Sequence, residues 1–204
     1  EGRKMVARYT LVTAPSSYQE SVEKALARVG LILGNFVLSP LALSGAVISE
    51  EEKDLGVIAV DIGGGTTKMT AWAEGRLVHV AVIPFAGEVI THDIREGCSI
   101  LQKWAEQLKI QYGQAMGDFA EEEKVVTIPG NNGWEPKEIS FKTLAYIIQA
   151  RLEEIIDSVY YQVEKAGFQN QSPQGIILTG GTTKMVNLLQ LVKFRTGMDA
   201  RLGF

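Results

Sequence analysis

The sequence is poor in the side chains that metal clusters and disulfides need. Its 204 residues include one cysteine, Cys98, and two histidines, His79 and His92. A single cysteine excludes an intrachain disulfide and fits a reducing compartment. Three such side chains also offer little for a transition-metal site, because those sites are built from clustered cysteine and histidine ligands. We therefore expect both histidines to be ordinary strand and loop residues.

Strong charge of one sign and long apolar runs are absent as well. The net charge is −4 and no dense basic cluster occurs, so nothing supports binding to nucleic acid, which usually leaves a basic footprint. No segment approaches the apolar length of a membrane span, and the first residues do not form a signal peptide. With 46% hydrophobic and 22% charged residues, the composition is typical of a soluble protein of one large or two small domains. The abrupt start at Glu1 and end at Phe204 lead us to expect a fragment of a longer chain.

Glycine, by contrast, is concentrated in two places, the first of which is Asp61–Lys68, reading Asp-Ile-Gly-Gly-Gly-Thr-Thr-Lys. It follows the apolar run 55–60, which predicts a buried strand. Three consecutive glycines leave the backbone without side chains, so its N–H groups can approach a phosphate closely. A carboxylate repels a phosphate unless a cation lies between them, so Asp61 suggests Mg²⁺ held through water. The candidate phosphate-binding residues are Gly63, Gly64, Gly65 and, through their hydroxyl groups, Thr66 and Thr67.

The same stretch also fits a plain β-hairpin. Residues 66–72 are prone to form a strand, Glu74 and Gly75 predict a turn, and 77–83 is again β-branched and apolar. Alone, the stretch is therefore compatible with phosphate binding or with a glycine turn of purely geometric origin. It matches neither a P-loop nor a dinucleotide-binding fingerprint, because the residues after the glycines continue as a strand.

Hydrophobic periodicity predicts the elements before this stretch. Two strands, at 6–12 and 31–38, are expected around a helix over 18–29, which makes a small β-α-β unit. A short apolar helix follows over 41–48. The acidic run 50–52 is most simply a solvated loop.

Helices dominate the prediction after residue 87. One begins near Glu88, a second covers 99–116, and the longest covers 141–165 with Ser140 as its cap. A strand over 125–128 separates the last two. We expect the apolar stripe of the longest helix to belong to the core.

Two charged residues of this longest helix, Arg151 and Glu154, are three positions apart. They can pair across the helix surface or face one ligand together. The ion pair is the simpler interpretation.

The second concentration of glycine lies at 175–184, where an apolar run ends in Thr179-Gly180-Gly181-Thr182-Thr183-Lys184. Unlike the first, it is predicted to lead into a helix, over 185–194. A helix N-terminus preceded by two glycines suits a phosphate or a flat base, because free N–H groups and the helix dipole point there. The alternative is a tight strand-to-helix turn, but two such junctions in one chain favour a ligand.

The two junctions, Asp61–Thr67 and Ile177–Thr183, resemble the second phosphate motif and the adenosine motif of the actin, Hsp70 and sugar-kinase superfamily. Further blocks narrow the resemblance to FtsA, the bacterial actin homologue of cell division. These blocks are Ser39–Ser44, Glu50–Gly56, Val82–Gly87, Ala105–Gly113 and Ile148–Glu154.

The resemblance implies an α/β, actin-like (RNase H-like) ATPase domain, with a mixed sheet flanked by helices and a smaller α+β subdomain. Residues 1–38 would be a remnant of the inserted subdomain, 1C, and 39–54 a helix of the first lobe. Residues 55–204 would be the second lobe. Within it, subdomain 2A would cover about 55–92 and 172–204, and subdomain 2B about 93–171.

The resemblance also implies ATP and Mg²⁺ as cofactors. Asp61 would hold the Mg²⁺ shell and the residues from Gly63 to Thr67 would contact phosphates. The nucleoside would lie against Gly180 and Gly181, with Arg151 and Glu154 on the adenine and ribose side and Lys184 over the base. Thr182 is a further cofactor-binding residue that the resemblance implies. The first phosphate loop of the family is absent from this chain, so the chain would hold about half of the site.

The implied function is that of a cytoplasmic, ATP-binding protein on the inner face of the cell membrane at the division site. Its partners would be FtsZ, further copies of itself in filaments, and the membrane, reached through a C-terminal helix absent from this chain. No catalytic residue is implied, because no clear base for an attacking water is present, and any ATPase activity would be slow. The alternatives are a superfamily enzyme, such as a sugar kinase or Hsp70-type ATPase, or a pilus-assembly scaffold related to FtsA.

Overall fold

Residues 1–38 and 39–204 form two separate units in the computed structural model of the chain, and each is described by itself. The structure describes residues 4–7, 11, 13, 15–130, 135–168 and 173–203. No helix in these ranges has both the length and the apolar character that crossing a membrane requires.

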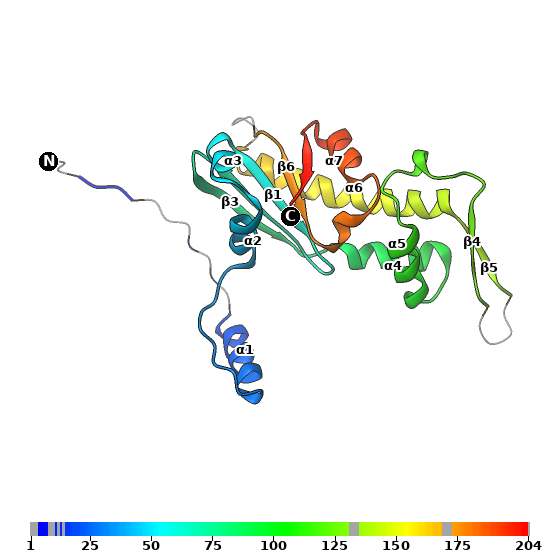
Figure 1. The fold of residues 1–204 in the computed structure, drawn as a ribbon, viewed down its shortest axis with the longest axis horizontal. Helices are drawn as coiled ribbons and strands as arrows, with labels where there is room; N and C mark the ends of the chain where they lie inside the picture. The colour runs from blue at the N-terminus through cyan, green and yellow to red at the C-terminus, as the bar shows by residue number, and fades with distance from the viewer. Residues whose placement is uncertain are drawn as a thin grey trace. The chain divides into compact units, whose positions relative to one another are not determined.

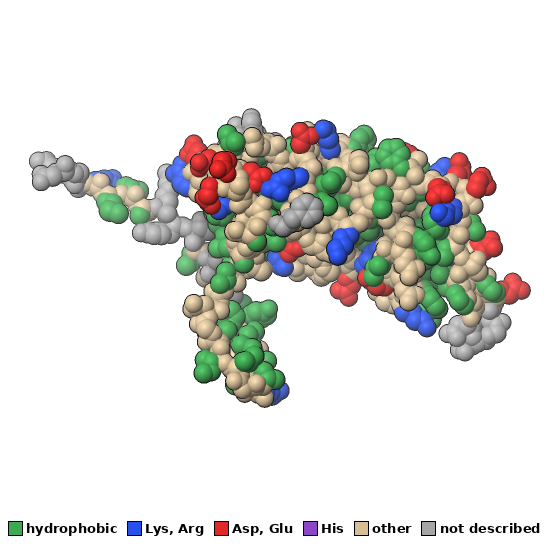
Figure 2. Space-filling model, viewed as in Figure 1, with side chains coloured by type: hydrophobic (Ala, Val, Ile, Leu, Met, Phe, Trp, Pro, Cys, Tyr) green, Lys and Arg blue, Asp and Glu red, His purple; other side chains and the backbone are tan. Residues whose placement is uncertain are grey.

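The N-terminal unit contains one helix, α1 (Ser16–Arg28), within its described residues. This confirms the predicted helix. The predicted strand over 31–38 is wrong, because that segment has no strand partner and Ile32 is 96% exposed; a strand without a ladder has no backbone partners to stabilise it. Most of the predicted strand over 6–12 lies outside the described residues, and residues 6, 7 and 11 are not in a strand. Figure 2 shows hydrophobic side chains open along this unit, consistent with the absence of buried residues from α1.

A mixed five-stranded sheet organises residues 39–204, in the order β3-β2-β1-β6-β7 (Figure 1). Its strands are β1 (Val57–Ile62), β2 (Thr67–Ala73), β3 (Arg76–Ile83), β6 (Ile176–Thr179) and β7 (Ala200–Leu202). The first three strands form antiparallel pairs, whereas β1, β6 and β7 are parallel. The predicted hairpin is therefore confirmed, while β7 is too short to stand out in the sequence.

Both faces of the central strand β1 are covered, which explains its continuous apolar sequence. Ile58 and Val60 belong to the main core, to which α6 (Phe141–Lys165) contributes one apolar face. Val57 and Ala59 belong to a smaller cluster with Ile48, next to α2 (Ser39–Val47). The sheet is thus packed between helices on both sides.

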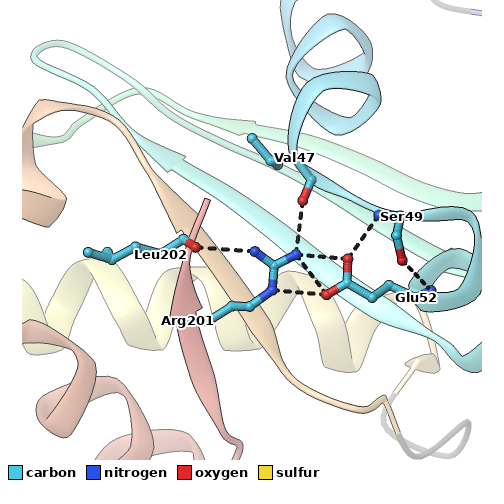
Figure 3. A network of polar contacts seen from close by, with 5 residues as sticks. All are labelled: Val47, Ser49, Glu52, Arg201 and Leu202. Carbon is cyan, nitrogen blue, oxygen red and sulfur yellow. Dashed lines mark hydrogen bonds and ion pairs between the residues drawn. The ribbon is translucent and has the colours of Figure 1, made fainter. Parts of the chain in front are cut away.

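The acidic run 50–52 begins helix α3 (Glu50–Leu55) and is not a loop. Ser49 and Glu52 form a capping box, in which Ser49 Oγ accepts from the Glu52 amide and Glu52 Oε2 accepts from the Ser49 amide. This pattern satisfies helix N–H groups that would otherwise lack partners. Glu52 also binds Arg201 of β7 at 2.7 and 2.8 Å, and Arg201 donates to the Val47 carbonyl (Figure 3).

The segment between β3 and β6 is a smaller α+β subdomain. Its elements are α4 (Gly87–Cys98), α5 (Gln102–Tyr112), the short η1 (Gly117–Phe119), the hairpin β4 (Val125–Ile128) and β5 (Lys137–Ser140), and α6. Figure 1 shows α6 running from this hairpin to the sheet. The predicted 141–165 helix is confirmed with Ser140 as its cap, whereas the predicted 99–116 helix is shorter at both ends.

After β6 the chain makes a short η3 (Gly181–Lys184) and then α7 (Leu188–Thr196). The helix predicted over 185–194 therefore begins three residues late. Met185, Val186 and Asn187 separate the two helices, and Asn187 has a left-handed backbone (φ 63°) that interrupts them.

Candidate functional site

The structure brings the two glycine junctions together. Strands β1 and β6 are parallel neighbours with Asp61 opposite Thr179, so the segments that follow the two strands leave the sheet at the same end. Thr182 Oγ1 donates to the Gly63 carbonyl at 3.0 Å, across 119 positions of sequence. Residues predicted to share one ligand thus lie side by side.

The Gly63 carbonyl connects both junctions to helix α4. Besides the Thr182 hydroxyl, it accepts from the Gly87 amide at 3.0 Å, and the next carbonyl, of Gly64, accepts from the Glu88 amide at 2.8 Å. The loop is therefore held by its carbonyl groups. Its amides at Gly64 and Gly65 have no acceptor within the described part of the chain, so they are free to bind an anion.

A cleft of about 430 Å³ opens between the two junctions and helix α5. This volume is within the range of small-molecule sites. Its lining includes Gly63, Gly64, Glu106, Lys109, Gly181, Thr182 and Lys184. Five of these seven residues were expected at a nucleotide site from the sequence, and two were not.

The two unexpected residues, Glu106 and Lys109, form a charged pair on one face of α5. Lys109 Nζ lies 2.8 Å from Glu106 Oε2 and donates to the Gly87 carbonyl at 2.9 Å and to Thr91 Oγ1 at 2.7 Å. Thr91 in turn donates to Glu106. The pair therefore braces the start of α4, which itself holds the first glycine junction.

The charge state of Glu106 follows from these contacts. Burial would raise the pKa of its carboxyl group, but the hydrogen bonds from Lys109 and Thr91 and the charge of Lys109 outweigh burial and lower the pKa from 4.5. Glu106 is thus an anion at neutral pH, with a carboxylate at the wall of the cleft that can accept from sugar hydroxyl groups. The sequence signal that could have indicated Glu106 was its position three residues before Lys109, on a helix that lies between the two junctions in the sequence.

Arg151 and Glu154 are not brought to this cleft. Arg151 Nε and Nη2 bind the Asp93 carboxylate at 2.5 and 3.1 Å, and its Nη1 pairs with Glu154. The hydrogen bond to Asp93 raises the pKa of the guanidinium. Glu154 borders a different groove, beside Tyr161 of α6 and the end of β3. The ion pair, which was the simpler interpretation, describes these residues in the structure.

The threonines of the first junction differ in their availability. Thr67 is buried and donates its hydroxyl to the Phe85 carbonyl at 2.9 Å, so its role is to hold the hairpin against the segment before α4. Thr66 is half-buried. Thr183, in the second junction, likewise closes a local turn by donating to the Gly180 carbonyl. Of the predicted hydroxyl donors at the first junction, only Thr66 is uncommitted among the described contacts.

The expected Mg²⁺ residue, Asp61, is already paired. Its Oδ2 lies 3.2 Å from Lys68 Nζ, and its side chain is only 20% exposed. Within the described ranges, no three acidic, histidine or cysteine side chains gather as a metal site would require. Because Mg²⁺ needs oxygen ligands and binds most tightly to uncompensated carboxylates, this donor set does not fit a directly coordinated metal.

The class of protein follows from the fold around these junctions. The structure resembles MreB5 of Spiroplasma citri bound to ADP, with a TM-score of 0.76, 22% sequence identity and coverage of 94% of this chain and 61% of that one. It also resembles a PilM-PilN type IV pilus biogenesis complex, with a TM-score of 0.67, 20% identity and coverage of 93% and 48%. The fold is therefore actin-like, as the sequence predicted.

Sequence comparison identifies the family within that class. A family model described as "Cell division protein FtsA" matches residues 58–204. The cell division protein FtsA of Pseudomonas aeruginosa is 35% identical over 202 residues, which cover 99% of this chain and 48% of the relative. The chain belongs to the FtsA family, and it spans about half the length of the curated relatives it matches.

Proposed function

We propose that this chain is the ATP-binding half of an actin-like cell-division protein. The observation that carries the proposal is the single cleft that both glycine junctions share with Glu106 and Lys109. In this proposal residues 55–92 and 172–204 are subdomain 2A and residues 93–171 are subdomain 2B. Residues 39–54 and 1–38 belong to the first lobe and to the inserted subdomain.

The free amides of Gly64 and Gly65 suit the phosphates of ATP, because bare backbone N–H groups bind anions closely. Glu106 suits the ribose hydroxyl groups, and Gly181 and Lys184 suit the base. A Mg²⁺ that accompanies ATP would remain hydrated on the phosphates, because Asp61 is already paired with Lys68. The nucleotides named for MreB5 of Spiroplasma citri, ADP and AMPPNP, support this ligand class.

The cellular role that we infer from the family is to recruit FtsZ to the inner face of the cytoplasmic membrane and to self-associate at the division septum. Membership in a cell-division family supports this role. The membrane contact would be made by a C-terminal amphipathic helix. Any ATPase activity would be slow, because the Glu106 carboxylate at the wall of the cleft is already engaged by Lys109 and Thr91.

Nucleotide binding is tested with the longest natural form of the protein that contains residues 1–204. Gly181→Val is the sharpest variant, because a Cβ there meets open space and disturbs no packing. We expect its affinity for ATP to fall at least tenfold, since the side chain would fill the cleft. Arg195→Ala, which loses an ion pair with Asp157 outside the cleft, is the matched control. Equal ATP affinity in the Gly181 variant and the unaltered protein would refute the cleft as the site.

The cellular role is tested by sedimentation with lipid vesicles. We expect FtsZ to pellet with vesicles only when this protein is present. If the protein pellets with vesicles but leaves FtsZ in the supernatant, the recruiting role is refuted, although the nucleotide site is untouched by that result.

A further inference from the structure

Three side chains stand in one row across the end of the sheet. In the strand register, Lys68 of β2 lies opposite Asp61 of β1, which lies opposite Thr179 of β6. Directly paired residues of neighbouring strands project from the same face. The next residue of β2 on that face, Thr70, bonds Ser44 of α2 at 2.7 Å, so the row lies on the α2 side of the sheet.

The row sits where both glycine junctions begin. A Cβ added to Gly180 would come within 2.5 Å of Asp61 Oδ1, so this oxygen lies against the second junction. The other oxygen of Asp61 faces Lys68 Nζ at 3.2 Å, with the two side chains 20% and 27% exposed. Thr179 Oγ1 is buried and lacks a hydrogen-bond partner within the described part of the chain.

The ion pair answers an electrostatic requirement of the phosphate site. A carboxylate near a phosphate is repulsive, and a cation must compensate it; partial burial strengthens both interactions, because the local dielectric is lower than that of water. In this chain the compensating cation is covalently present, as the Lys68 ammonium. A carboxylate that is already paired also attracts a second cation less strongly than a free one.

We propose that Lys68 is a built-in counter-ion of the phosphate site, which lets this chain bind nucleotide with little dependence on a divalent cation. The proposal rests on the nucleotide-binding function proposed above. Lys68 acts through Asp61: it neutralises the carboxylate beside the phosphates and holds it toward the strand, away from them. When Lys68 is replaced, Asp61 is freed, and Mg²⁺ becomes the group that must compensate it.

The test measures the affinity for ATP and ADP by titration calorimetry, once in excess Mg²⁺ and once in EDTA, with the longest natural form of the protein. For the unaltered protein we expect the two affinities to agree within about threefold. Lys68→Met should lose about tenfold or more in EDTA and clearly less in Mg²⁺, since a charge interaction of this kind is worth at least a factor of that order. Lys68→Arg keeps the charge and should restore binding in EDTA.

The matched control is Lys193→Met, which removes a lysine of α7 from an exposed ion pair with Asp199. It should bind as the unaltered protein does under both conditions. Thermal unfolding without nucleotide establishes that each variant is folded.

The outcomes separate the two proposals. If the unaltered protein binds no nucleotide under either condition, the proposed function fails. If it binds with a strong Mg²⁺ requirement, or if Lys68→Met changes both affinities by the same factor, the nucleotide site stands and the counter-ion role is overturned.

Discussion

Glycine is present for different reasons at Gly64, in the first glycine junction, and at Gly180, in the second. Gly180 has a left-handed backbone (φ 94°), and an added Cβ would lie 2.5 Å from two oxygens, Asp61 Oδ1 and the Ile62 carbonyl. At Gly64 no atom of the described residues, apart from its own chain neighbours, lies within 4 Å of an added Cβ, and its φ is outside the left-handed region. The fold therefore requires glycine at 180 but does not require it at 64.

This difference separates structural from ligand-dependent glycines. A glycine that packing does not need, in a loop with free amides beside a cleft, is explained by the close approach of a ligand to the backbone. Gly180 thus serves the packing of the second junction, whereas Gly64, like Gly181, lies beside the cleft where an added Cβ meets open space. Substitutions at Gly180 and at Gly64 should accordingly change different measurements.

The largest effect is expected for Gly180→Ala. The methyl group would be forced against two oxygens in a backbone conformation that L-residues avoid, so we expect the free energy of unfolding to fall by about 3 kcal/mol. Denaturant unfolding measures this loss. Gly181→Ala is the neighbouring control, because its Cβ would meet open space. A loss below about 1 kcal/mol at position 180 would show that the junctions do not differ in this way.

Lys109→Met should have the next largest effect, because it breaks the support of the first junction. The substitution leaves the Gly87 carbonyl, Thr91 and the Glu106 carboxylate without their shared donor. We expect a loss of about 2 kcal/mol in the free energy of unfolding, since Lys109 is mostly buried. Lys103→Met, on the exposed side of the same helix, should cost less than about 0.5 kcal/mol. Equal losses in the two variants would contradict the bracing role.

The fold could be predicted from the sequence where one pattern dominates. The apolar stripe of α6 and the cap Ser140 predicted that helix with its bounds, and glycines after apolar runs predicted both junctions. Strand β5 was missed because Lys137–Ser140 contains a single apolar residue, Ile139, and β7 because its three residues are too few for a period to show. The segment 31–38 has strand propensity but no strand to pair with, and propensity alone does not form a sheet.

The site could be predicted in part, because glycine clusters are rare and charged pairs on helices are common. Glu106 with Lys109 and Arg151 with Glu154 share one spacing, three residues apart, so spacing cannot tell which pair reaches the cleft. Glu106 and Lys109 reach the cleft because α5 packs beside the junctions, and the sequence does not show this packing. The capping box of Ser49 and Glu52, by contrast, could have been predicted, because a serine followed three residues later by a glutamate is its sequence pattern. The prediction of a loop for the acidic run overlooked this pattern.

A smaller effect, dependent on pH, tests how much of the support of the first junction is electrostatic. The pKa of Glu106 is lower in the folded chain than its ordinary 4.5, so its stabilisation is complete above about pH 4.5 and is lost as the pH falls through the folded pKa. The difference in unfolding free energy between the unaltered chain and Glu106→Gln should therefore shrink on acidification. Because the side chain is 45% exposed, solvent screening limits the effect to less than about 1 kcal/mol.

Unfolding curves measured between about pH 6 and about pH 3 give this difference. Glu121→Gln, which breaks an exposed pair with Lys124, is the control and should show a weaker trend. A difference that grows as the pH falls would have the wrong sign for the charge network described.

The smallest effect on stability, and the sharpest on binding, is expected for Gly64→Ala. With open space around the new methyl group, the free energy of unfolding should change by less than about 0.5 kcal/mol, because the only general effect of alanine is to restrict the unfolded chain. The affinity for ATP should nevertheless fall at least tenfold, because the methyl group stands where a phosphate must approach the amides. Gly45→Ala, in helix α2 with equally open surroundings, should stabilise the helix and leave the affinity unchanged. If Gly64→Ala binds ATP as tightly as Gly45→Ala does, the open glycine of the first junction is not there for a ligand, and the distinction between the two junctions is one of packing alone.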